Sequence, residues 1–141
     1  PYTTLFRSAD MENNPAYIDS ALKQGYEVEI DVWHTINGWF LGHDCPQYSI
    51  QVDYLKNDRL WCHAKNLEAL QLMLEEEIHC FWHQEDDHTL TSRGIIWTYP
   101  NKSLTASSVC VNINKRDDNF ENNLFGVCSD WISTYLEDYS K

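Results

Sequence analysis

Short strand-like segments recur along the chain with helical or one-turn spacers between them, and this repetition constrains the fold most. The segments are runs of apolar, often β-branched residues, and they cover residues 27–33, 60–64, 78–83, 94–98, 108–112 and 125–129. Strands separated by such spacers return to the same end of a sheet and pair in parallel. The repetition therefore predicts an α/β fold with a mostly parallel sheet.

Helix signals fall in the spacers between these segments. Asn14 can cap a helix that has Pro15 at its first position and ends at Gly25. Asn66 precedes a second amphipathic pattern, in which leucines recur on one face. Two shorter helices are expected as well, at 52–57 and 131–139.

The segment EVEIDVW alternates acidic with β-branched apolar residues. Alternation puts the carboxylates of Glu27, Glu29 and Asp31 on one face of a strand. Side chains two apart on a strand lie roughly 6.5–7 Å from each other, so like charges there repel unless a cation separates them. The Asn37-Gly38 hairpin signal and His43-Asp44 follow, which favours a divalent-cation site with an acid/base group nearby over a solvated acidic face.

Composition narrows the possible partners and compartments. The 141 residues are 43% hydrophobic and 13% aromatic, enough for one cooperative core. A net charge of −12 without a basic stripe argues against nucleic acid. We see neither an apolar run of transmembrane length nor a secretion signal. The five cysteines lack Cys-x-x-Cys spacing, which predicts a reduced, cytoplasmic protein.

The first twelve residues do not fit this pattern. PYTTLFRS is neither alternating nor helical, and it looks like translated adapter sequence. We therefore expect residues 1–12 to be non-native or disordered, and residues 13–141 to form a single domain.

Side chains that can ligate, titrate or stack lie at several strand ends. Parallel sheets place functional groups at the carboxyl ends of their strands. Each group alone is explained by core packing or solvation, but their convergence at one end of the sheet would define a site. The groups are Glu29, Asp31, His63, Lys65, His83, Glu85 and Trp97.

These motifs together resemble the glycerophosphodiester phosphodiesterases, which are phospholipase-C-like phosphodiesterase barrels. The resemblance rests on a Glu-Asn before the first helix, a Glu-x-Asp at a strand end and a glycine-containing turn leading to His-Asp, and it covers nearly all of the chain after residue 12. The matching positions are Glu12-Asn13, Glu29, Asp31, His43-Asp44, Lys65, Trp97-Thr98 and residues 126–130.

The resemblance implies a small, incomplete (β/α) TIM-type barrel that hydrolyses a small-molecule phosphodiester, such as a glycerophosphodiester of lipid metabolism. It implies one divalent cation (Mg, Ca or Mn) held by Glu29 and Asp31, and a catalytic acid/base role for His43. We expect the substrate to be bound by Lys65, His83, Glu85 and Trp97.

Two positions depart from the family. Its opening strand carries a catalytic His-Arg-Gly, which Arg7-Ser8 does not match, so the genuine first strand is expected to be missing and hydrolysis impaired. Its Glu-x-Lys is replaced by His63-x-Lys65, so the third metal ligand would be an imidazole, which makes Zn possible.

Two alternatives remain open at this stage. A barrel of this kind can bind a phosphorylated polyol or lipid head group without cleaving it. The cluster His79-Cys80-x-x-His83 can instead form a zinc site, although residues four apart share a face on a helix rather than on the predicted strand. The sequence does not indicate an oligomeric state.

Overall fold

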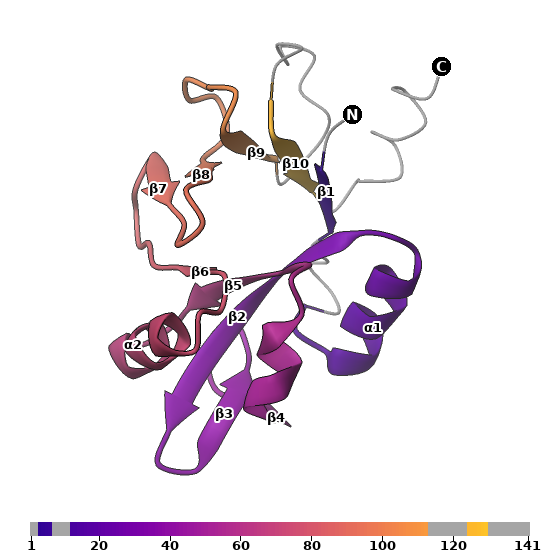
Figure 1. Cartoon of the computed structure of the whole chain (residues 1–141), viewed down its shortest axis with the longest axis vertical. Helices are drawn as coiled ribbons and strands as arrows, with labels where there is room; N and C mark the ends of the chain where they lie inside the picture. Colours follow the sequence, from indigo (N-terminus) through magenta and orange to yellow (C-terminus); the bar gives the residue numbers. More distant parts are fainter. Residues whose placement is uncertain (1–2, 7–11, 113–123, 130–141) are drawn as a thin grey trace.

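The computed structural model describes residues 3–6, 12–112 and 124–129, and Figure 1 shows its course. The predicted helix at 131–139 and residue 130 of the last-strand segment lie outside these residues. The elements are β1 (Thr3–Phe6), α1 (Pro15–Lys23), β2 (Glu27–Thr35), β3 (Gly38–Leu41), β4 (Tyr48–Ile50), the 3-10 helix η1 (Val52–Lys56), β5 (Leu60–Ala64), α2 (Leu67–Glu75), β6 (Cys80–Phe81), β7 (His88–Leu90), β8 (Ile96–Thr98), β9 (Ser108–Asn112) and β10 (Gly126–Ser129).

All ten described strands belong to one sheet. Its main path runs β4-β3-β2-β1-β10-β9-β8-β7. Outside this path, β5 pairs with β2, and β6 pairs with β5. The pairs β1–β2, β2–β5, β5–β6, β8–β9, β9–β10 and β1–β10 are parallel, whereas β3, β4 and β7 pair antiparallel. The prediction of an α/β fold with mostly parallel strands is confirmed.

The sheet curves but remains open, so a closed TIM-type barrel is not what the described residues form. Figure 1 shows it bending from β2 through β1, β10 and β9 to β8 and β7. No ladder joins β6 to β7 among the described strands. The two-residue β6 is instead linked to the chain after β7, through the Ser92 N–H donating to the Cys80 carbonyl at 2.8 Å.

The two faces of the central strand β2 carry different residues, apolar on one and acidic on the other, as the alternation predicts. Val28, Ile30 and Val32 are buried in an apolar cluster with residues of α1, β5 and α2. Glu29 and Asp31 lie on the opposite face. A second cluster, containing residues of β1, β5, β6, β8, β9 and β10, fills the concave side: Leu5, Trp61, Phe81, Trp97, Val109, Val111 and Cys128. Burial of both faces is typical of parallel sheets.

Both described helices begin at the predicted asparagines. The Asn14 side chain accepts a hydrogen bond from Ala16 N at 3.0 Å, and the Asn66 side chain accepts one from Ala69 N at 3.0 Å. Asn66 also donates to the carbonyl of His34 at 2.7 Å, which ties the start of α2 to the end of β2. Neither helix has the length and apolar character needed to cross a bilayer.

Four of the five cysteines are buried, and Cys45 is exposed.

Three short strands were not expected from the sequence. Segment 1–12 contains β1, whose backbone pairs in parallel with β2 on one side and β10 on the other. The segment was expected to be non-native or disordered, and disorder is wrong for Thr3–Phe6, because two neighbouring strands impose extended structure on residues with no pattern of their own. Its non-native origin stays a prediction. The strands β4 and β7 lie at the sheet edges and form only through antiparallel pairing.

Candidate metal centre

A cavity of about 330 Å³ lies on the concave side of the sheet, beside the middle of β2 and the end of β5. It brings together every predicted site residue except Glu85, which is exposed and does not line it. The lining residues are Glu29, Asp31, His43, His63, Ala64, Lys65, Trp82, His83, Gln84 and Trp97.

The two carboxylates of β2 are buried in this cavity. The exposed fraction is 5% for Glu29 and 1% for Asp31. The solvated acidic face considered from the sequence is therefore wrong. Two buried carboxylates on one strand repel each other, and such a pair is stable only with a compensating positive charge or proton.

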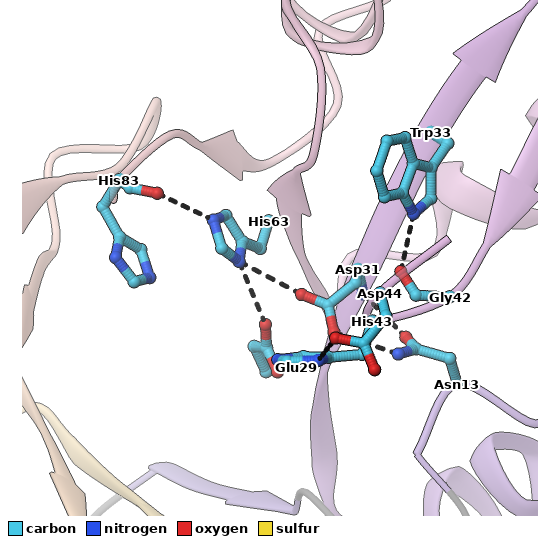
Figure 2. Close-up of polar contacts among 9 residues, drawn as sticks. All are labelled: Asn13, Glu29, Asp31, Trp33, Gly42, His43, Asp44, His63 and His83. Carbon is cyan, nitrogen blue, oxygen red and sulfur yellow. Dashed lines mark hydrogen bonds and ion pairs between the residues drawn. The ribbon is translucent and has the colours of Figure 1, made fainter. Parts of the chain in front are cut away.

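His63 on β5 lies against both carboxylates, opposite Asp31 in the strand register. Its Nδ1 is 3.1 Å from Asp31 Oδ1 and 3.9 Å from Glu29 Oε1, as Figure 2 shows. On the other side of the ring, Nε2 lies 3.2 Å from the carbonyl oxygen of His83. A carbonyl only accepts, so Nε2 carries the hydrogen and Nδ1 faces the carboxylates. Nδ1 and the two carboxylates are therefore placed so that they can ligate one metal ion.

Two groups of described residues place their ligand atoms within 4.8 Å of one another and could hold a metal ion. One is Glu29, Asp31 and His63, and the other is Glu12, Asp31 and His43. Carboxylate oxygens suit Mg, Ca and Mn, while an imidazole nitrogen suits Mn and Zn. The donors of the first group therefore fit the predicted divalent cation.

Asn13 holds Asp31 in place, a role that sequence reasoning missed. Asn13 is 3% exposed and has a φ of 68°, a conformation that asparagine adopts more readily than most residues. Its side-chain oxygen accepts from Asp31 N at 2.7 Å, and its Nδ2 donates to Asp31 Oδ2 at 3.0 Å. The Glu-Asn pair before the first helix was the available signal.

His43 lies on the turn that follows β3. Gly42 fixes this turn: its N–H donates to the Asp31 carbonyl at 3.2 Å, and its own carbonyl accepts from Trp33 Nε1 at 2.7 Å (Figure 2). His43 Nδ1 lies 2.9 Å from Asp44 Oδ1, and the His43 side chain is 48% exposed. The ring therefore borders the cavity while remaining open to solvent.

His83 and Trp97 form part of the aromatic wall of the cavity. The His83 ring is stacked on that of His63, with centroids 4.3 Å apart. Burial, aided by the nearby His63, lowers the pKa of His83 to about 4, so its ring is neutral at neutral pH. Trp97 is buried and packs against Phe81, with centroids 5.0 Å apart, which is a core contact as well as a cavity wall.

Two further lining side chains, Trp82 and Gln84, were not predicted. Both are exposed and flank His83. Their positions beyond the end of β6 depend on the path of a loop, which periodicity does not indicate.

The structure does not bring the alternative zinc cluster together. His79 Nε2 bonds Thr91 Oγ1 at 2.9 Å in the buried interior, whereas His83 lines the cavity. Neither histidine belongs to a candidate metal group within the described part of the chain.

Comparisons with protein-family models, curated proteins and solved structures find no match to this chain. The fold and the site define an α/β protein with a mostly parallel, curved sheet and a buried acidic pocket on its concave side. The family resemblance stays a prediction.

Proposed function

We propose that this chain binds one divalent cation (Mg, Ca, Mn or Zn) through Glu29, Asp31 and His63 and hydrolyses a phosphodiester such as a glycerophosphodiester. The observation that carries the proposal is the placement of these three ligand groups within 4.8 Å of one another, in a cavity that His43 and Lys65 also line. In this interpretation the curved sheet is a small, incomplete (β/α) TIM-type barrel.

The charges around the cavity suit a phosphodiester anion. When bound, the cation would neutralise the non-bridging oxygens and make phosphorus more susceptible to attack. Glu29 and Asp31 cancel its charge, and Lys65 adds a positive charge to receive the substrate. The net charge of −12 otherwise repels anions, so this local reversal is required.

His43 is the candidate for proton transfer. Its Nδ1 faces Asp44 Oδ1 at 2.9 Å, so a hydrogen on Nδ1 directs Nε2 away from Asp44. Nε2 is then free to exchange a proton with the attacking or leaving oxygen.

We further propose that hydrolysis by this chain is slow. The resemblance implies a second catalytic histidine in a His-Arg-Gly, and residues 1–12 contain no histidine. A missing general acid or base costs roughly 10²–10⁴-fold in rate.

The test compares the chain with a version whose residues 1–11 are replaced by a strand ending in His-Arg-Gly. Hydrolysis of a chromogenic phosphodiester is measured with each of the four metals and with EDTA. We expect the replacement to accelerate the reaction by about 10²–10⁴-fold, and both EDTA and Asp31→Asn to abolish it.

Inactivity of the altered protein with every metal would contradict the enzymatic proposal. Retention of a phosphorylated polyol or lipid head group in EDTA would instead support the non-catalytic alternative.

A further inference from the structure

We propose that the centre selects a first-row transition dication, from manganese to zinc, over calcium and magnesium, because His63 ligates through Nδ1. This inference rests on the metal site of the proposed function and identifies the class of its cofactor.

The distances at His63 fit a small coordination shell. Zinc ligands lie about 2.0–2.2 Å from the ion, so two of them are at most about 4.4 Å apart. Nδ1 is 3.1 Å from Asp31 Oδ1 and 3.9 Å from Glu29 Oε1. All three ligand groups lie within 4.8 Å of one another, so one ion can contact them with small movements of the side chains.

The orientation of the ring is set by its other nitrogen. A histidine ligand commonly donates its second N–H to a carbonyl or carboxylate, which fixes the tautomer and makes the ligating nitrogen more basic. Here Nε2 faces the His83 carbonyl at 3.2 Å. The ring also lies nearly parallel to those of His83 and Phe81, at interplanar angles of 8° and 4°. These contacts keep Nδ1 directed at the carboxylates.

This donor set disfavours the hard cations. Calcium takes 6–8 oxygen ligands, and magnesium also requires oxygen and gives up its water reluctantly. Glu29 and Asp31 supply carboxylate oxygens, but the third ligand is nitrogen. A nitrogen ligand favours dications such as manganese, cobalt and zinc over the hard cations, and affinity rises from manganese to copper before it falls at zinc.

The experiment measures affinities of the full chain for Mn²⁺, Zn²⁺, Mg²⁺ and Ca²⁺ by calorimetry. His63→Glu restores an all-oxygen set of ligands. His43→Gln is the matched control, since it removes the histidine of the second candidate group instead. We expect Mn²⁺ and Zn²⁺ to bind at least about tenfold more tightly than Mg²⁺ and Ca²⁺, and His63→Glu alone to remove most of this preference.

A second readout does not require His63→Glu to fold. Bound Mn²⁺ should show magnetic coupling to ¹⁴N in the unaltered chain, and the coupling should persist in His43→Gln.

Other outcomes would overturn this inference. Tighter binding of calcium or magnesium, or absence of nitrogen coupling, would overturn this inference and leave the proposed function standing. Coupling lost in His43→Gln would move the ion to Glu12, Asp31 and His43 and also overturn it. Absence of binding by all four metals would overturn both proposals.

Discussion

The cavity has two halves that are held very differently. Glu29, Asp31 and His63 come from adjacent paired strands, and the two carboxylates are almost completely buried. His43 comes from a turn, and about half of its side chain is exposed. The difference teaches that the proposed cation-binding half is part of the sheet itself, whereas the proposed proton-transfer half depends on one local turn.

The largest expected effect comes from neutralising the buried half. Asp31→Asn keeps the shape of the side chain but removes one of the two negative charges that are proposed to hold the ion. We expect metal affinity to fall by more than about 100-fold, beyond the range for groups that merely support a ligand. Calorimetry checks this, with exposed Asp44→Asn as the control. Equal losses in the two variants would remove the distinction between the halves.

Acid should destabilise the protein through the buried histidine His79. Burial, with a contribution from Arg93 that nearby Asp58 opposes, lowers the pKa of His79 from 6.5 to about 4. The unfolded chain therefore binds the proton first, and the stability present above pH 6.5 is lost as the pH falls towards 4. The loss is at most about 3 kcal/mol for this group.

Urea denaturation at pH 7 and pH 5 measures this effect. His79→Gln should reduce the difference in unfolding free energy between the two pH values. An unchanged difference in His79→Gln would show that other groups cause the acid sensitivity.

Gly42→Ala should disrupt the turn while sparing the buried half. A Cβ at this position would overlap the carbonyl oxygen of Cys45, so the backbone must move. We expect the unfolding free energy to fall by about 1–3 kcal/mol. Asp44→Ala, on the same turn but exposed, should stay within about 0.5 kcal/mol. Metal affinity unchanged in Gly42→Ala would sharpen the comparison, and its complete loss would contradict it.

A smaller loss of metal affinity than in Asp31→Asn is expected when the support of Asp31 is removed. Asn13→Gly keeps the positive φ but removes both hydrogen bonds to Asp31, so metal affinity should fall about 10- to 100-fold. Asn101→Gly is the matched control, because Asn101 has a φ of 66° and is exposed outside the cavity lining. Calorimetric affinities that agree between the two variants would show that the Asn13 bonds do not position the ligand.

The elements carrying the site were predictable because their signals are local. The alternation around Glu29 and Asp31 places them on one face, and the apolar run of β5 gives the strand that carries His63. The strand β1 and the support from Asn13 were not predictable in this way. Both depend on partners distant in the chain: β10 for β1, and Asp31 for Asn13.

Glu85 was wrongly predicted to line the cavity, because local signals do not give the path of a loop. The segment 78–83 was expected to continue as a strand, but β6 contains only Cys80 and Phe81. The loop that follows directs His83 to the cavity lining and leaves Glu85 outside it.

The buried carboxylates of Glu29 and Asp31 have a consequence for thermal stability. An ion that binds only the folded chain stabilises it by about 2.7 kcal/mol when its concentration is 100 times the dissociation constant. Adding such an ion to a chelated sample should therefore raise the melting temperature, and Asp31→Asn should lose this response. Thermal melting can thus detect an occupied pocket without a substrate.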